Sequence, residues 1–242
     1  MYAAWLVSLL VFMLALYRFP SLAPQPGTER LRRPGREVLY ALGAVVLLFA
    51  LSQLTDNWFA AWKKIPGTGR LVWFFQLLIV YSPIAAVLVW RKQGLDTCLL
   101  RRDKLPYKLL LGLSLGVLAS VVFLAVRGKI TDYPLYLTTL GKGGPVAMLQ
   151  TFLEGLGLGF LVYRFTGWIG IRWAAAIVAV LFMAAHIPVY TGQSVGLSLP
   201  VGIAMAAAHA GISVAVLVAM WKSQDIVVLF FLHWFINRAS SF

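Results

Sequence analysis

Four side chains in the second half of the sequence are of types that can catalyse hydrolysis, and all four lie within apolar segments. Glu154 lies within QTFLEGLGLGF, His186 ends the run FMAAH, and His233 and Asn237 enclose HWFIN. A carboxylate can take a proton from water, and imidazole and amide groups can donate hydrogen bonds to a developing oxyanion. An ionisable side chain inside an apolar segment is energetically expensive and therefore indicates a functional site.

The spacing and depth of these residues support a common site. His233 and Asn237 are four residues apart, which places them on one face of a helix. The depth of each residue can be estimated from the basic residues that flank its predicted span, at a rise of about 1.5 Å per residue. The distance along the helix axis is about 15 Å for Glu154, 21 Å for His186, 19 Å for His209 and 16 Å for His233. Each of four predicted helices thus places one ionisable side chain at a similar depth in the membrane. We expect His209 to be a packing residue rather than a member of the site.

The surroundings of Glu154 predict how its carboxyl group is accommodated. Gln150 precedes it by four residues, so its amide should lie on the same helical face and form a hydrogen bond with it. Gly155 and Gly159 should let a neighbouring backbone approach closely and keep lipid away from the carboxylate.

The elements that must position these side chains are predicted to be transmembrane helices. The chain is 61% hydrophobic and 12% charged, with a mean hydropathy of +0.84, far from the values of soluble domains. Runs of about twenty apolar residues cross a bilayer as helix. Eight occur, at 2–19, 37–54, 71–90, 107–126, 145–163, 172–190, 199–221 and 225–240. The first is predicted to be a retained signal-anchor helix.

The predicted fold is therefore an all-α polytopic membrane protein of about eight transmembrane helices, built as one continuous membrane domain. Residues 1–144 supply the first four helices with basic cytoplasmic loops. Residues 145–242 supply the last four, which should surround a polar catalytic cavity.

The net charge of +13 has a topological explanation. Fourteen of the 21 Lys and Arg side chains flank odd-numbered loops and seven flank even-numbered ones. This bias predicts that the odd loops are cytoplasmic and that both termini lie outside. Basic loops beside a bilayer also favour binding of anionic lipid. The sequence has no module of alternating aromatic and basic residues of the kind that binds nucleic acid. We expect a multi-pass protein of a bacterial or archaeal plasma membrane.

Smaller features give further expectations. Gly112 and Gly116 form a GxxxG pattern, which is typical of close helix packing. Pro83 should kink the third apolar run. Cys98 is the single cysteine, which excludes an internal disulfide, and in a cytoplasmic loop it should be a reduced, inert thiol.

An intramembrane Glu followed by Phe-x-x-x-His and His-x-x-x-Asn on successive late helices resembles the CPBP family. These are the ABI proteins, which include type II CAAX prenyl endopeptidases and bacteriocin-processing proteins. FMAAH (182–186) and HWFIN (233–237) match its second and third motifs. The run WKSQDIVVLFFLHWFIN (221–237) resembles the closing turn and last helix, so the likeness covers about 145–240.

The first family motif, Glu-Glu-x-x-x-Arg, is degenerate in this chain. Aligned on the Gly-Phe-Leu that follows, Glu154 is the second Glu, with Leu153 and Leu158 at the first Glu and the Arg. Aligned as the first Glu, it is followed by Gly155 at the position of the second Glu and by Gly159 at the position of the Arg. Either alignment lacks one carboxylate and the Arg.

The resemblance implies an intramembrane (metallo)endopeptidase that hydrolyses a peptide bond of a membrane-associated protein or peptide. Glu154 would activate water and be held by His186, while His233 and Asn237 would stabilise the tetrahedral intermediate. In a metal version, Glu154, His186 and His233 would be ligands of a Zn²⁺ ion. No HEXXH motif is present.

Two other hypotheses stay open at this point. One is a catalytically inactive family member that acts as a membrane scaffold or regulator, which the missing Glu and Arg favour. The other is a proton-coupled membrane carrier that uses the Glu and His layer as a relay, although the sequence has no transporter-type internal repeat.

Overall fold

The computed structural model describes residues 2–20, 31–140, 144–191 and 196–240, and each of the eight apolar runs forms a helix in it. Within these residues all regular elements are helical, which confirms the predicted all-α class. The helices are α1 (Tyr2–Arg18), α2 (Pro34–Trp58), α3 (Gly69–Trp90), α4 (Leu105–Val126), α5 (Tyr133–Leu140), α6 (Gly144–Ile169), α7 (Ile171–Thr191), α8 (Leu199–Ser223) and α9 (Val227–Ser240). Short 3-10 helices lie at Trp62–Lys64, Leu95–Cys98 and Ile130–Asp132.

Six of the described helices, α2, α3, α4, α6, α7 and α8, are long and apolar enough to cross a membrane. The chain is thus a membrane-type helical protein. The other two predicted spans are shorter, because α1 has 17 residues and α9 has 14. At about 1.5 Å per residue α9 is about 21 Å long, less than the roughly 30 Å of a hydrocarbon core. Helix α5 was not among the predicted spans.

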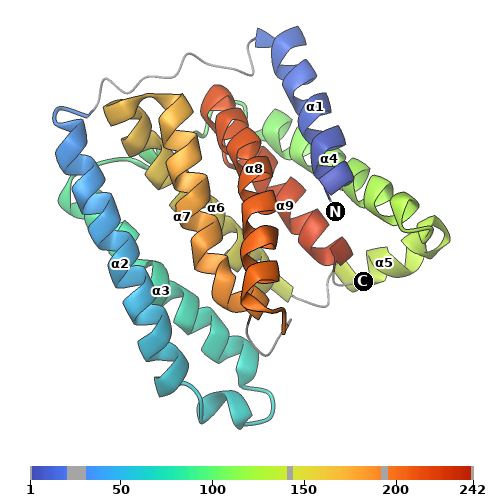
Figure 1. Cartoon of the computed structure of the whole chain (residues 1–242), viewed down its shortest axis with the longest axis horizontal. Helices are drawn as coiled ribbons and strands as arrows, with labels where there is room; N and C mark the ends of the chain where they lie inside the picture. The colour runs from blue at the N-terminus through green and yellow to red at the C-terminus, as the bar shows by residue number, and fades with distance from the viewer. Residues whose placement is uncertain (1, 21–30, 141–143, 192–195, 241–242) are drawn as a thin grey trace.

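The helices form three groups side by side (Figure 1). Helices α6 to α9 lie in the middle, the α2–α3 hairpin lies on one side, and α1, α4 and α5 lie on the other. Helix α6 packs against both α2 and α7, and α9 packs against α4. The last four helices are therefore the central layer of the molecule.

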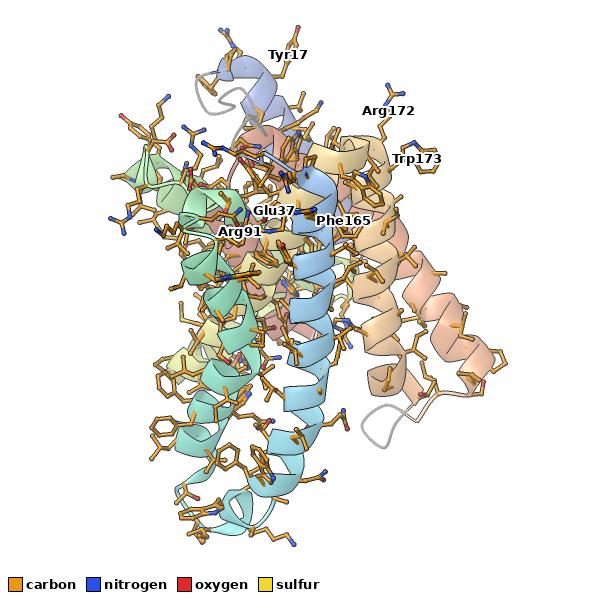
Figure 2. The ribbon with its side chains drawn as sticks, turned by 90° about the vertical axis from the view of Figure 1, so that its left-hand side faces the viewer. Tyr17, Glu37, Arg91, Phe165, Arg172 and Trp173 are labelled. Carbon is orange, nitrogen blue, oxygen red and sulfur yellow. The ribbon has the colours of Figure 1, made fainter. Side chains whose placement is uncertain are left out.

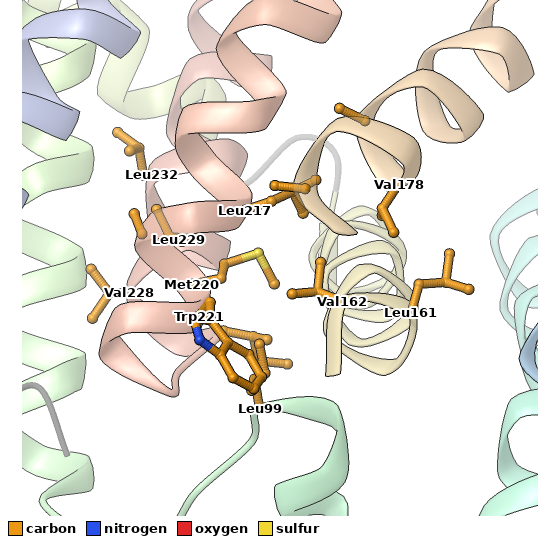
Figure 3. Packing of buried hydrophobic residues seen from close by; sticks show 14 of the residues in the cluster. Leu99, Leu161, Val162, Val178, Leu217, Met220, Trp221, Val228, Leu229 and Leu232 are labelled. Atoms are coloured by element: carbon orange, nitrogen blue, oxygen red, sulfur yellow. The ribbon is translucent and has the colours of Figure 1, made fainter. Parts of the chain in front are cut away.

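The interior of the central layer is filled by apolar side chains. Met220 and Trp221 of α8 meet Val162 of α6, and Leu229 and Leu232 of α9 close the same cluster (Figure 3). Helix α4 approaches α9 closely. A Cβ atom at Gly112 would lie 3.1 Å from the Cα atom of Val228, and one at Gly116 would overlap the Phe235 ring. The GxxxG prediction is confirmed: the two glycines bring α4 against α9.

A buried polar network joins the α2–α3 hairpin to α6 at their basic end. The Arg164 guanidinium is fully buried and donates to the carbonyl oxygen of Thr97 at 3.2 Å and to the side-chain oxygen of Gln93. Its Nε lies 3.9 Å from Glu37, also buried. Glu37 accepts from Arg91 at 2.9 and 3.0 Å and from Gln93 at 3.0 Å (Figure 2). Charges and hydrogen bonds thus fix this end of the hairpin.

A second buried pair fixes the start of α9, the helix that carries His233. Asp225 Oδ2 lies 2.6 Å from Lys108 Nζ, and both side chains are buried. Asp225 Oδ1 accepts from the backbone N–H groups of Val227 and Val228 at 2.5 and 3.3 Å. The carboxylate therefore satisfies orphan donors at the N-terminus of α9.

The two glycines expected to admit a neighbouring backbone behave differently. A Cβ atom at Gly159 would overlap the carbonyl oxygen of Cys98, so the loop before α4 packs directly on α6 there. Apart from its own helix, no described part of the chain lies within 4 Å of a Cβ atom built at Gly155. The prediction is confirmed for Gly159 and wrong for Gly155. Gly157 instead faces α3, with Tyr81 Cε1 3.7 Å from such a Cβ atom.

This difference provides a matched test of packing within α6. We expect Gly159→Ala to lower the free energy of unfolding by about 1–3 kcal/mol, because the new methyl group displaces backbone. Gly155→Ala should leave it unchanged or raise it by up to about 1 kcal/mol, since alanine is the better helix former. Thermal unfolding of both variants in detergent measures the contrast, and equal stability would contradict the close approach.

The environment of Cys98 supports an inert thiol. The side chain is fully buried beneath α6, and burial raises the pKa of the thiol to about 11. The reactive species is the thiolate. We therefore expect the folded protein to resist a maleimide reagent near pH 7.5 and to be labelled once denatured, as mass spectrometry would show. Equal labelling of both states would contradict this packing.

Candidate functional site

A cavity of about 320 Å³ contains the central residue of the site, Glu154. Its polar lining residues are Glu154 and Gln150 of α6, His186 of α7 and Tyr81 of α3. The rest of the wall is apolar and includes Val45, Leu48, Phe49, Ile84, Leu158, Leu161, Leu181 and Phe182. This size falls within the range of about 300–1,000 Å³ typical of small-ligand sites.

Glu154 is held by its own helix. Gln150 Nε2 donates to Glu154 Oε1 at 2.9 Å, which confirms the predicted hydrogen bond between these residues. Both side chains are partly buried. Along α6, Glu154 is ten residues before Arg164, about 15 Å from the buried polar network. The carboxyl group therefore lies near the middle of α6, one of the helices long and apolar enough to cross a membrane.

His186 has a defined orientation and tautomer. Its Nδ1 lies 2.8 Å from the backbone oxygen of Phe182, and its ring packs 4.5 Å from the Phe182 ring. A carbonyl oxygen only accepts, so Nδ1 carries the proton of the neutral ring and Nε2 keeps a lone pair. In that tautomer Nε2 accepts hydrogen bonds and does not donate them.

The other predicted site residues lie outside this cavity. His233 of α9 is partly buried, packs 5.9 Å from the ring of Trp5, and interacts electrostatically with both Glu154 and His186. Asn237 lies one turn further along α9, is exposed, and does not line the cavity. Glu154, His186 and His233 are thus brought together, whereas Asn237 is not among the residues that line the cavity.

His209 has a different neighbour, on α7. Its Nδ1 bonds the Met205 carbonyl oxygen at 2.8 Å and lies 3.4 Å from the Tyr190 hydroxyl, and the two rings stack at 5.7 Å. This packing agrees with the expectation that His209 is not a member of the site.

The zinc hypothesis names Glu154, His186 and His233 as the metal ligands. Within the described parts of the chain, no group of three or more His, Cys, Asp or Glu side chains is placed to hold an ion. The zinc site of Glu154, His186 and His233 therefore stays a prediction, and no chemical step below depends on it.

The wall opposite Glu154 differs from the expectation that the last four helices surround the cavity. Helices α6 and α7 line one side, and α2 and α3 from the first half of the chain line the other. Helices α8 and α9 contribute none of the lining residues. The α2–α3 hairpin reaches this position because the buried Glu37 and Arg164 network holds it against α6.

Tyr81 is the functional candidate that the sequence reasoning did not find. It lines the cavity and interacts electrostatically with Glu154. The sequence signal was a Tyr-Ser-Pro triplet inside an apolar run. Pro83 has no backbone N–H to donate to the Ile79 carbonyl oxygen, four residues earlier. Ser82 Oγ donates to that oxygen instead, at 2.7 Å, and α3 continues through the triplet.

Comparison with known proteins returned no matching family model, curated protein or solved structure. The resemblance to the CPBP family therefore stands on the short motifs alone.

Proposed function

We propose that this protein is an intramembrane endopeptidase that cleaves a peptide bond of a membrane-associated protein or peptide with a water activated by Glu154. The observation that carries the proposal is the position of Glu154: a carboxyl group near the middle of a helix long enough to cross a membrane, in a cavity it shares with His186 and Tyr81. A carboxyl group inside such an apolar helix is expensive unless it has a function.

The proposed reaction uses these three groups. The water donates one hydrogen bond to Glu154 and one to His186 Nε2, which leaves an oxygen lone pair for attack on the scissile carbonyl carbon. Glu154 takes a proton as the C–O bond forms. The Tyr81 hydroxyl donates to the resulting oxyanion. Glu154 then returns the proton to the leaving nitrogen as the C–N bond breaks, which yields a carboxyl group and an amine.

His233 and Asn237 have less direct roles in this scheme. His233 interacts electrostatically with Glu154 and His186 without lining their cavity. Their assignment as oxyanion donors, taken from the family resemblance, stays a proposal. So do the topology with both termini outside, the anionic lipid at the basic loops and the prokaryotic plasma membrane.

Heavy-oxygen water tests the proposed activity without knowledge of the substrate. The purified protein in proteoliposomes is mixed with a solubilised membrane fraction of its host, in heavy-oxygen water, and new peptide ends are mapped by mass spectrometry. Hydrolysis places one heavy oxygen in each new C-terminal carboxyl group. New ends equally frequent in liposomes without the protein would overturn the proposal.

Tyr81→Phe tests the role of the hydroxyl. We expect the rate of cleavage to fall by about 10²–10³-fold, the usual loss for one oxyanion donor, while the ring keeps its packing against Gly157. The thermal unfolding midpoint should change little. A fully active Tyr81→Phe variant would remove Tyr81 from the mechanism.

One observation favours a second candidate, an inactive membrane scaffold or regulator. Glu154 is the only acidic side chain among the residues that line the cavity, so the structure adds no partner for the carboxylate missing from the first motif. A chain that produces no new peptide ends in the heavy-oxygen experiment would favour this candidate.

A further inference from the structure

A second cavity, of about 520 Å³, adjoins the Glu154 cavity at the far end of the α2–α3 hairpin. The two cavities share the lining residues Leu48, Phe49, Tyr81 and Gln150. The second is the more polar and is lined by Ser52 and Asp56 of α2, Lys63, and Trp73 and Gln76 of α3. The two cavities are therefore neighbours, and they provide a polar end and a mainly apolar end side by side.

The polar end carries one charge of each sign. Lys63 Nζ and Gln76 Nε2 donate to Asp56 Oδ1 at 2.8 and 2.9 Å. No donor among the described residues is paired with Asp56 Oδ2. The Asp56 and Lys63 side chains are 52% and 37% exposed, so each charge remains accessible to a ligand.

The polar end lies at the level of a membrane interface. Asp56 follows Glu37 by 19 residues on α2, which is about 28 Å along the helix axis. This length is close to the roughly 30 Å of a hydrocarbon core. Glu37 belongs to the buried network at the basic end, so Asp56 lies at the opposite boundary. Exposed Trp58 and Trp62 beside it are typical of such a boundary.

We propose that this pair of cavities binds a zwitterionic phospholipid with an ammonium group, such as phosphatidylethanolamine. The ammonium group donates to Asp56 Oδ2, and the phosphate accepts from the remaining N–H groups of Lys63. One acyl chain lies along Leu48 and Phe49 toward the Glu154 cavity. An anionic headgroup offers no ammonium group to Asp56 Oδ2 and places a second negative charge beside the Asp56 carboxylate.

The site is independent of peptide cleavage and is tested by lipid retention. The purified chain is incorporated into nanodiscs that contain equal amounts of phosphatidylethanolamine and phosphatidylglycerol. Native mass spectrometry then measures which lipid stays bound on release. We expect phosphatidylethanolamine to be retained preferentially, and Asp56→Asn to reduce its retention by about tenfold, as expected for loss of a charge-assisted hydrogen bond.

Two further variants make the result specific. Asp56→Glu keeps the charge and should keep most of the retention. Asp103→Asn, which breaks the exposed Arg101–Asp103 pair at 3.0 Å at the other interface, should leave retention unchanged. Equal retention of the two lipids, preference for phosphatidylglycerol, or normal retention in Asp56→Asn would each overturn the proposal.

Discussion

Replacing Glu37 by glutamine should lower the free energy of unfolding by about 3–5 kcal/mol, the usual consequence of breaking a buried ion pair. Glu37 is buried beside Arg91 and the fully buried Arg164. The amide keeps the size of the side chain but removes the charge that compensates the two guanidinium groups. Chemical unfolding in mixed micelles measures the loss, and the thermal midpoint should fall in parallel.

Asp56 is on the same helix as Glu37, and its ion pair with Lys63 provides the matched control. Its nitrogen–oxygen distance of 2.8 Å is as short, but both side chains are substantially exposed. Exposed ion pairs contribute about 0–1 kcal/mol, so Asp56→Asn should change stability by no more than that. Equal losses in Glu37→Gln and Asp56→Asn would contradict the burial of the network.

The helices of this protein were largely predictable because a bilayer imposes length and apolarity on each one. All eight apolar runs are helical, and their bounds agree to within four residues except at the end of α6, which continues six residues beyond the predicted run. Helix α5 was missed because its eight residues, YPLYLTTL, are too few to give a membrane signal. The length of α9 was overestimated because residues 225–226 are apolar or capping residues that belong to the turn before the helix.

Within the site, the contacts that could be predicted were those between residues of the same helix. The bond between Gln150 and Glu154 follows from their spacing alone. The contribution of α2 and α3 to the cavity does not, because it depends on how distant helices pack. Tyr81 therefore looked like any other aromatic residue in an apolar run.

Arg164 shows how an average rule can misplace a particular residue. By its position in the sequence, Arg164 is one of the fourteen basic residues that flank odd-numbered loops, which the charge bias predicts to be cytoplasmic. It lies inside α6 and is fully buried, with Glu37, Gln93 and Thr97 as partners. Its partners are 67 to 127 residues away in sequence, so no local pattern could reveal them. At the basic end of the bundle, Arg164 therefore joins helices to one another in addition to contributing positive charge.

Replacing Glu154 by glutamine should lower the rate of peptide cleavage by about 10²–10⁴-fold, the usual contribution of a general base. The amide keeps the shape of the side chain, and its oxygen can still accept the hydrogen bond from Gln150. It cannot take a proton from water. Heavy-oxygen incorporation into new C-termini, compared between wild type and variant at equal protein concentration, measures the loss.

Stability separates a catalytic role of Glu154 from a structural one. A carboxyl group inside an apolar helix of this kind is expensive to maintain, so the Glu154→Gln variant should be as stable as the wild type or more so. His209→Ala is the matched control for activity, because His209 packs on Tyr190 and should leave cleavage unchanged. A wild-type protein without cleavage, whose stability falls on Glu154→Gln, would contradict the peptidase proposal. Glu154 would then be a structural hydrogen-bond acceptor for Gln150, and the inactive scaffold would be the better description of the protein.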